Sequence, residues 1–417
     1  MANDAEKRHP GFKFVPVYYM GNEDADLDEL GHFFINGEKF NWETKQTGAV
    51  GHMKIDDALI RLITRAEGQI RVLPYGAELM DRLKRIFQKG KRIQQAMLEL
   101  VNDLFSSFGL VVMIADSALM KSQVIPVFEK ELFEDGASPL VVQTTTALDA
   151  AGYKVQAHPR EINLFYLADG IRNRIEKQGG EYQVVNTALK FSADEIRTEL
   201  HQHPERFSPN VILRGIYQES ILPNVAFVGG GGETAYWLQL KSLFKAYNVF
   251  FPVLLVRNSF LLLSKKQDAA LKNMNLDAPQ LFQGAERLME WLVKREAGGV
   301  VSISEKLEQA SKLYDQLKEQ ATQIDKSLLS HIDALKTQTL AKLEQLEKKF
   351  IRAEKRNHSD QRRQLEGIIS ALFPNGGLQE RVENFMPFYG KYGPAWLKNL
   401  YENSGSFEQD FCIVTYK

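Results

Sequence analysis

The chain has 417 residues, of which 44% are hydrophobic and 25% are charged, and this is an ordinary composition for a folded protein of more than one domain. Its 52 Lys and Arg residues against 53 Asp and Glu residues give a formal net charge of −1, so no overall basic field would attract nucleic acid. There is a single cysteine, Cys412, and no apolar run of transmembrane length, so we expect a cytoplasmic protein without a disulfide, a membrane span or a cysteine-rich zinc site.

The first expected element is a strand at 12–20, which is apolar enough to be buried on both faces of a parallel sheet. An acidic loop follows it directly, with Glu23, Asp24 and Asp26 as candidate catalytic groups. Open α/β sheets bind their ligands at the carboxyl ends of parallel strands. Carboxylates in this loop could hold a magnesium ion or accept a proton from an amine. A solvated loop that starts a helix is an equally consistent interpretation.

Residues from about 30 to 108 are interpreted as an insertion, irregular or β-rich to 55 and helical from 56, where two or three helices are expected. A second buried strand at 110–115 ends at Asp116, which is placed either as a site carboxylate or as a helix cap. Further strands are expected at 139–143 and 162–167.

Two polar side chains near the strand at 162–167 are candidate substrate ligands. Arg160 precedes the strand and could bind an anion through two hydrogen bonds, although a surface ion pair is the more frequent role of such an arginine. Asn163 lies beside it. The histidines at 158, 201 and 203 are interpreted as loop residues, because no other metal-binding side chains cluster with them, and no metal site is expected.

The stretch 217–237 carries the central hypothesis. An apolar strand at 225–228 is followed by four glycines and then by helical spacing of apolar residues, so the unit is strand, glycine turn and helix. The N–H groups that open such a helix are unpaired, and glycine lets an anion approach them closely. We therefore predict a phosphate or carboxylate site here, with a ligand-free tight turn as the alternative. The candidate ligands are Gln218, Glu219, Asn224, Gly229, Gly230, Gly231, Gly232, Glu233 and Tyr236.

An apolar run at 249–263 is expected to form one long strand or two. Arg257, Asn258 and Ser259 interrupt it, and polar groups inside such a run are costly when they are buried without partners. Contact with a ligand is favoured as their role over hydrogen bonds to a neighbouring loop.

From 265 to 372 the chain is expected to be helical. Apolar residues at alternating spacings of three and four form a heptad seam that slips at 328–332 and then resumes, which predicts a long antiparallel helical hairpin with one break. A second glycine turn follows, where Asn375, Gly376, Gln379 and Arg381 could contact a ligand or cap the arm. The domains are therefore a core at 1–264, an arm at 265–372 and a C-terminal segment at 373–417 that packs back on the core, ending in a strand.

Several motifs give this chain a resemblance to a known family. They are the stretches 15–26, 159–167, 218–224, 229–237 and 372–381. Through them the chain resembles the bacillithiol biosynthesis enzymes that add cysteine, described as cysteine ligases. The resemblance covers nearly the whole chain. It implies an α/β protein with a Rossmann-like, mostly parallel sheet, a helical insertion, and a long α-helical coiled-coil arm that forms a homodimer.

The resemblance also implies an activity, the ligation of cysteine to the amine of glucosaminyl malate through an amide bond in the last step of bacillithiol biosynthesis. The two malate carboxylates suit the glycine turn and an arginine such as Arg160 or Arg257, and Glu23 or Asp24 suits proton removal from the amine. ATP or another nucleotide is suspected as the group that activates cysteine, and the turn after 372 is a candidate second nucleotide site. The sequence has no GxxxxGK[ST] loop, which disfavours a P-loop mechanism.

Two departures from the family pattern stand out. Family members commonly carry histidine where this chain has Ala25, and they have a substantial region ahead of the first motif. We therefore expect an N-terminally shortened version that exposes apolar sheet surface around 12–20. The alternatives are an inactive remnant of such a ligase, a nucleotidyl or glycosyl transferase on a similar core, and a non-catalytic coiled-coil assembly protein.

Overall fold

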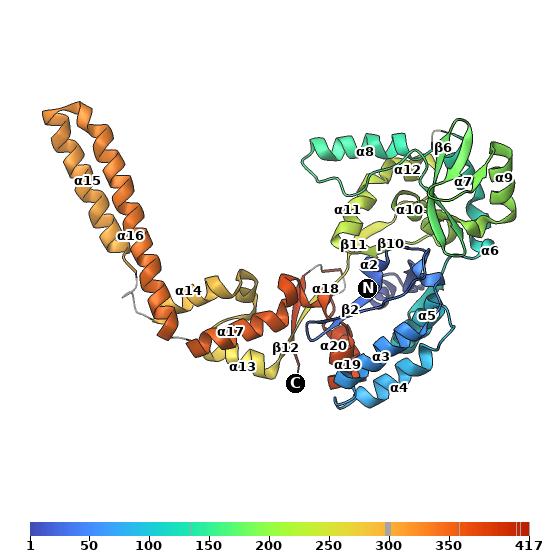
Figure 1. The fold of residues 1–417 in the computed structure, drawn as a ribbon, viewed down its shortest axis with the longest axis horizontal. Coiled ribbons are helices and arrows are strands. Elements are labelled where there is room, and N and C mark those ends of the chain that lie inside the picture. The colour runs from blue at the N-terminus through green and yellow to red at the C-terminus, as the bar shows by residue number, and fades with distance from the viewer. Residues whose placement is uncertain (135, 297–301, 358, 406, 409, 417) are drawn as a thin grey trace. The chain divides into compact units, whose positions relative to one another are not determined.

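The computed structural model describes residues 1–134, 136–296, 302–357, 359–405, 407–408 and 410–416 (Figure 1). The chain divides into two compact units. The first comprises Met1–Ser259 and Asn384–Cys412, and the second comprises Phe260–Glu383 and Ile413–Lys417. The boundary at Ser259 lies within the predicted core. The predicted C-terminal segment at 373–417 is divided between the two units.

Two pairs of parallel strands form the sheet core of the first unit. β1 (Val17–Met20) pairs with β4 (Val111–Ile114), and β10 (Ala226–Gly229) pairs with β11 (Val253–Val256). The parallel pairs agree with the expected open α/β arrangement. β1 begins after Pro16, whose carbonyl accepts the N–H of Val111.

A five-stranded antiparallel sheet, in the order β8-β7-β6-β5-β9, belongs to the same unit. Its strands are β5 (Leu164–Ala168), β6 (Ile171–Gln178), β7 (Glu181–Val184), β8 (Lys190–Phe191) and β9 (Phe207–Pro209). The helices of this part are α6 (Ala118–Lys121), α7 (Ile125–Phe133), α8 (Ser138–Ala150), α9 (Ala193–Gln202), α10 (Val211–Ile221), α11 (Gly231–Gln239) and α12 (Lys241–Ala246). The largest core side chains include Trp237, Tyr217, Phe128 and Phe207.

The strand predicted at 139–143 is wrong, because these residues belong to helix α8. Pro139 lies in the first turn of the helix, where its missing N–H costs nothing, and of the α8 residues Val141 is the one that is buried. A short apolar run does not distinguish a strand from a helix that buries one stripe.

The predicted insertion consists of a hairpin and three helices. β2 (His32–Ile35) pairs antiparallel with β3 (Glu38–Asn41), and α3 (Asp57–Ile70), α4 (Gly76–Ile86) and α5 (Ile93–Phe105) follow. A side chain at Gly76 would collide with the carbonyl oxygen of Ile70, so the tight α3–α4 turn requires glycine. The remaining helices of this unit are α1 (Ala2–Arg8), α2 (Leu27–Leu30), α19 (Met386–Tyr392) and α20 (Pro394–Asn403), and α19 packs on α4 (Figure 1).

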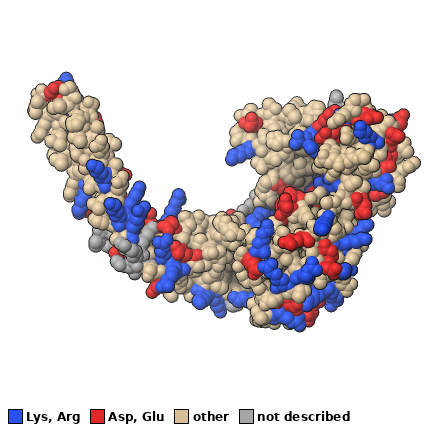
Figure 2. Space-filling view, viewed as in Figure 1, with Lys and Arg blue, Asp and Glu red and all other residues tan. Residues whose placement is uncertain are grey.

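Apolar surface is exposed around 12–20, as expected, but the prediction of a strand over 12–20 buried on both faces is wrong, because the strand covers only Val17–Met20 and is partly exposed. Phe12 is 68%, Val15 62% and Tyr18 42% exposed. Val228 in β10 and Val253 in β11 are 48% and 58% exposed. Elsewhere on the first unit, Lys and Arg side chains alternate with Asp and Glu side chains on the visible face (Figure 2).

The second unit contains the predicted helical hairpin. α15 (Ser304–Ile324) and α16 (Leu329–Asn357) pack together, and the ion pairs Lys318–Asp333 (2.8 Å) and Lys336–Asp315 (2.7 Å) require an antiparallel arrangement. The break lies at 325–328. The unit also contains α13 (Lys265–Asn273), α14 (Ala285–Glu296), α17 (Ser359–Leu372) and α18 (Gln379–Val382). It holds most of β12 (Ser259–Ser264) and of β13 (Phe411–Tyr416), which pair with each other. Among the described residues, no helix is both long and apolar enough to cross a membrane.

Candidate functional site

The loops that follow β1 and β4 meet at one edge of their sheet, since the two strands are parallel and in register. The Nδ2 of Asn22, two residues beyond β1, donates to Oδ2 of Asp116 at 2.7 Å and to Oε1 of Gln94 at 2.9 Å. A side chain at Gly51 would collide with the carbonyl oxygen of Asn22. This close approach brings the short 3-10 helix Val50–His52 against the β1 loop and places His52 at the same edge.

His52 and Asp116 form a hydrogen-bonded pair at this edge. Nε2 of His52 lies 2.7 Å from Oδ2 of Asp116, and the side chains are 33% and 13% exposed. Burial alone would raise the pKa of Asp116, but the hydrogen bond and charge of His52 outweigh it and lower this pKa. When the imidazole is neutral, its Nε2–H donates a hydrogen bond to the ionised Asp116, and Nδ1 is then the basic nitrogen. The pair can therefore act as an oriented general base.

Asp24 lies between two arginines. Both Nη atoms of Arg214, on α10, bond to its carboxylate, one of them at 3.2 Å, and Nη2 of Arg172, on β6, is 3.7 Å away. Burial would lower the pKa of Arg214, but the hydrogen bond to Asp24 outweighs it and raises this pKa. For Arg172 burial prevails and lowers the pKa. Two guanidinium groups against one carboxylate leave a positive charge that suits an anionic ligand.

Of the two arginines, Arg172 is the one with a hydrogen-bond donor that has no partner among the described residues. Its side chain is only 9% exposed and lies 4.1 Å from the centre of the Phe165 ring. Its Nε is buried and has no acceptor among the described residues. A buried guanidinium nitrogen without a partner is costly.

Glu23, predicted to be catalytic, is instead bonded on both carboxylate oxygens. Oε1 contacts the ammonium group of the fully buried Lys121, and Oε2 accepts the hydroxyl of Ser208 at 2.8 Å. Lys121 also donates to the carbonyl of Glu205 at 3.2 Å. Asp26, the third predicted carboxylate, is the N-cap of α2 and accepts the N–H of Glu29 at 3.1 Å.

The strand, glycine turn and helix occur where the sequence predicts them. β10 ends at Gly229 and α11 begins at Gly231. The carboxylate of Glu233 caps the N–H of Gly230 at 3.4 Å, so part of the bend is closed by its own side chain. The N–H groups of Gly231 and Gly232 open the helix, and a Cβ added at either glycine would meet no neighbouring side chain or loop within 4 Å. The bend therefore keeps two N–H groups for an anion.

Arg257 lies beside this bend, and Tyr236 is influenced both by the charge of Glu233 at the bend and by that of Arg214. The Arg257 guanidinium lies 3.8 Å from the position that a side chain at Gly230 would take. Burial and the nearby charge of Glu233 raise the pKa of Tyr236 to about 12, whereas Arg214 lowers it. Tyr236 is thus within electrostatic range of both groups. Two further polar atoms near the bend, Oγ1 of Thr234 and Nδ2 of Asn258, are buried without partners among the residues that the structure describes.

The other predicted ligands around the bend bond to one another. Glu219 accepts the backbone N–H of Asn224 at 2.8 Å, its Nδ2 at 2.8 Å and Nε2 of Gln218 at 3.1 Å. Burial raises the pKa of Glu219. The three side chains fasten the loop that enters β10. Ser259 begins β12 and stands at the junction between the two units.

The predicted ligands Arg160 and Asn163 have partners other than Arg172, Asp24 and Arg214. Arg160 is exposed, and its backbone N–H donates to Asn163. Asn163 is fully buried and bonds to Glu131 and to Asn210, each through its side chain. These hydrogen bonds fix the residues that lead into β5.

The second glycine turn lies in the second unit. Gln379 is buried, and its amide bonds to the backbone N–H of Leu262 at 3.0 Å and to its carbonyl at 3.3 Å, which fastens β12. Arg381 lies 3.4 Å from Glu380, and Asn375 and Gly376 adopt positive φ of 53° and 77°. In the described part of the chain, no group of three or more His, Cys, Asp or Glu side chains is arranged to hold a metal ion.

Comparison with known proteins gives matches along almost the whole chain. Residues 1–258 match the family model described as the N-terminal Rossmann-like domain of bacillithiol biosynthesis BshC, and residues 260–416 match its C-terminal coiled-coil domain. A relative from Cytophaga hutchinsonii is 39% identical over 91% of this chain and 71% of its own length. Relatives from Flavobacterium johnsoniae and Christiangramia forsetii are 38% and 35% identical, over 100% and 99% of this chain and 78% and 77% of their own lengths. All three carry the name "Putative cysteine ligase BshC".

Proposed function

The chain belongs to the BshC family of bacillithiol biosynthesis, with its Rossmann-like and coiled-coil domains, and we propose that it is a cysteine ligase whose active site is the cluster at the carboxyl ends of β1 and β4. Its family and fold class are those expected from the sequence motifs. The observation that carries the site proposal is that the β1 loop links the oriented His52–Asp116 pair to the Arg172–Asp24–Arg214 group. The backbone N–H of Val50, two residues before His52, donates to the carbonyl of Asp24 at 2.8 Å.

We assign the acceptor substrate to glucosaminyl malate, as the family resemblance implies. The two malate carboxylates are the anionic part of this molecule. The guanidinium group of Arg172 and the N–H groups of Gly231 and Gly232 are donors suited to them. Arg257 beside the bend adds a further positive charge.

The chemical step is the formation of an amide between the cysteine carboxyl carbon and the sugar amine. The amine must present a free lone pair, so one proton leaves its nitrogen as the C–N bond forms. We assign the acceptance of this proton to Nδ1 of His52, with Asp116 holding the ring. The carboxyl group must lose one oxygen, and ATP or another nucleotide would supply the activation that makes this oxygen leave with a phosphoryl group.

A homodimer through the arm and a reducing cytoplasmic location complete the proposal. Apolar side chains remain exposed on the packed α15–α16 hairpin, among them Leu313 (53%), Leu317 (39%) and Leu335 (39%). A second copy of the hairpin would cover them. The single cysteine of the chain is consistent with a reducing compartment.

A product assay tests the proposed function. The purified protein is incubated with cysteine and glucosaminyl malate, with and without ATP, and the mixture is analysed by mass spectrometry. We expect a product whose mass equals the sum of the two substrates less one water. If the protein binds both substrates and forms no such product with any nucleoside triphosphate, the ligase proposal is overturned.

A further inference from the structure

The two donor groups assigned to the malate carboxylates come from different elements of the first unit. Arg172 lies on β6, and the N–H groups of Gly231 and Gly232 open α11. The two carboxylates of one small molecule have a narrow range of separations, so donors that bind both must be held at a matching distance. Helix α10 contacts both the antiparallel sheet and α11, and these two contacts set that distance.

One end of α10 is fastened to the sheet that carries Arg172 by a pair of asparagines. Asn210 is the N-cap of α10 and accepts the backbone N–H of Ile212 at 2.8 Å. Its Nδ2 donates to Oδ1 of Asn163 at 2.8 Å, and its backbone N–H donates to the carbonyl of Asn163 at 3.0 Å. Asn163 directly precedes β5, the strand that pairs with β6, and Leu167 of β5 is the register partner of Arg172. The asparagine pair therefore joins α10 to the strands around Arg172.

Asn163 is held in place from its other side by Glu131. It is fully buried, and its backbone N–H and its Nδ2 both donate to Oε1 of Glu131 at 2.7 Å. Oε2 of Glu131 accepts the backbone N–H of Ala137 at 2.7 Å. A Cβ at Gly136, whose φ is +59°, would lie 2.7 Å from the same oxygen, so the loop after α7 requires glycine to close on Glu131. The asparagine pair therefore has a rigid support.

The middle of α10 packs closely on the helices that follow the glycine bend. A Cβ at Gly215, which is buried in α10, would lie 3.2 Å from Cδ1 of Leu240 and 3.5 Å from the ring of Phe244. Leu240 is the C-cap of α11, the helix that Gly231 opens. A larger residue at 215 would crowd these neighbours. Helix α10 therefore connects the sheet of Arg172 to the helix of the bend.

We propose that Asn163 and Asn210 are positioning residues that fix the separation between Arg172 and the N–H groups of the glycine bend, and that they thereby select an acceptor with two carboxylates. Both residues act through the elements that they join. Without their contact α10 can shift against β5, and the two donor groups then no longer fit one dicarboxylate at the same time. This inference rests on the proposed function and adds a source of specificity to it.

Calorimetric titration of two acceptors into the whole chain tests the inference. Glucosaminyl malate carries two carboxylates, and glucosaminyl lactate, with a methyl group in place of the carboxymethyl group, carries one. Asn210→Ser keeps a side-chain oxygen to cap α10 and loses the Nδ2 bond to Asn163. We expect this variant to bind the malate about fivefold more weakly than the wild type and the lactate equally well. In the ligase assay KM for the malate should rise about fivefold with kcat unchanged.

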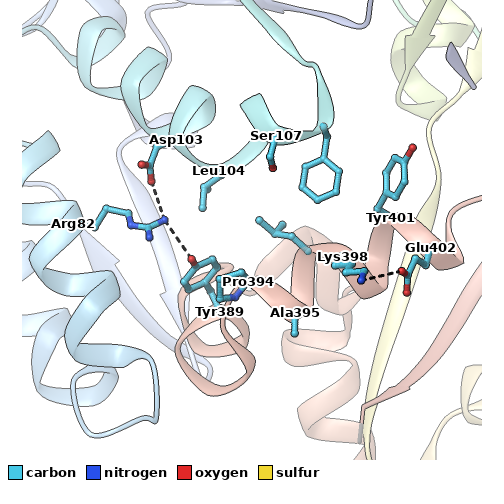
Figure 3. A pocket seen from close by; sticks show the side chains of 12 residues that line it. Arg82, Asp103, Leu104, Ser107, Tyr389, Pro394, Ala395, Lys398, Tyr401 and Glu402 are labelled. Carbon is cyan, nitrogen blue, oxygen red and sulfur yellow. Dashed lines mark hydrogen bonds and ion pairs between the residues drawn. The ribbon is translucent and has the colours of Figure 1, made fainter. Parts of the chain in front are cut away.

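Two control variants each remove one hydroxyl bond elsewhere in the first unit. Tyr166→Phe breaks the 2.7 Å bond from β5 to Glu199 of α9. Tyr389→Phe breaks the 3.2 Å bond that Arg82 donates to the Tyr389 hydroxyl in the helical insertion (Figure 3). Neither bond involves α10, so both variants should keep the wild-type ratio of the affinities for the two acceptors.

This ratio does not depend on the fraction of folded protein, so a general loss of stability leaves it unchanged. If the wild type binds glucosaminyl malate and Asn210→Ser keeps the wild-type ratio, the inference is overturned and the proposed function stands. A lowered ratio in Tyr166→Phe and Tyr389→Phe as well would also overturn the inference. Absence of glucosaminyl malate binding by the wild type would overturn the proposed function and the inference together.

Discussion

Nε2 of His52 lies 2.7 Å from Oδ2 of Asp116, although 64 positions separate the two residues in the chain. Asp116 also accepts Nδ2 of Asn22, so its carboxylate is held in place from two directions. A fixed carboxylate fixes the tautomer and the orientation of the imidazole that bonds to it. The pair thus gives the edge of the β1–β4 sheet an oriented base.

Replacing the base should reduce turnover more than binding. For His52→Gln we expect kcat of the ligase reaction to fall by about 10²–10⁴-fold with little change in KM, the range for loss of a general base. The matched control is His201→Gln, because His201 is exposed and also lies 3.0 Å from a carboxylate, that of Glu129. A His52→Gln enzyme with the turnover of the control would contradict the assignment.

The lowered pKa of Asp116 predicts a pH-dependent contribution to stability. The folded chain binds this proton less tightly than the unfolded chain, so the contribution is present above the unfolded value of about 3.9 and is lost as the pH falls through the lower folded value. Asp116→Asn should therefore lower the urea midpoint at pH 7, and its difference from the wild type should shrink as the pH falls below about 4. A difference that stays constant down to pH 3 would count against this account.

The Glu23–Lys121 pair should stabilise the fold. Lys121 is fully buried and Glu23 is 11% exposed, so Glu23→Gln leaves a buried ammonium without its counter-charge, at a cost of roughly 3–5 kcal/mol in the free energy of unfolding. The double variant Glu23→Gln with Lys121→Met should recover much of this loss. Glu6→Gln, which breaks the exposed Lys13–Glu6 pair, should change the free energy of unfolding far less, because solvent screens that pair. Urea unfolding of the four proteins measures these differences, and a Glu23→Gln variant as stable as Glu6→Gln would refute the prediction.

The arm should carry the contact between two copies of the chain. Glutamates at both Leu317 and Leu335, each 39% exposed, would place charges on the apolar surface that we assign to the dimer. We expect light scattering to report a dimer for the wild type and a monomer for the double variant, with unchanged helical content. Gln320→Glu, at an exposed position on the same helix, should remain dimeric. A dimeric double variant would exclude this surface.

Features with a local cause were predictable from the sequence. The glycine bend follows from a strand, four glycines and a helical pattern within twenty residues, and the arm follows from its heptad spacing. The run at 139–143 was ambiguous, since three consecutive apolar residues fit a strand or a helix.

The proposed active-site cluster depends on tertiary contacts that the spacing of residues along the sequence does not predict. His52 lies in a stretch interpreted as an irregular insertion, and it reaches Asp116 only because Gly51 packs against Asn22. Arg214 and Arg172 come from a helix and an antiparallel strand, and neither had a distinguishing local pattern. The sequence located Glu23 and Asp24 correctly at a strand end, but their partners, Lys121 and Arg214, are supplied by tertiary packing.

The most direct measurement of the central claim is a titration of glucosaminyl malate into three proteins, the wild type, Arg172→Met and Arg174→Met. Arg174 lies two residues beyond Arg172 on the same strand and is 42% exposed. Loss of a charge-assisted contact from Arg172 should weaken binding by about 10–150-fold, whereas Arg174→Met should bind like the wild type. Wild-type affinity in Arg172→Met would contradict the claim that this cluster holds the carboxylates of the substrate.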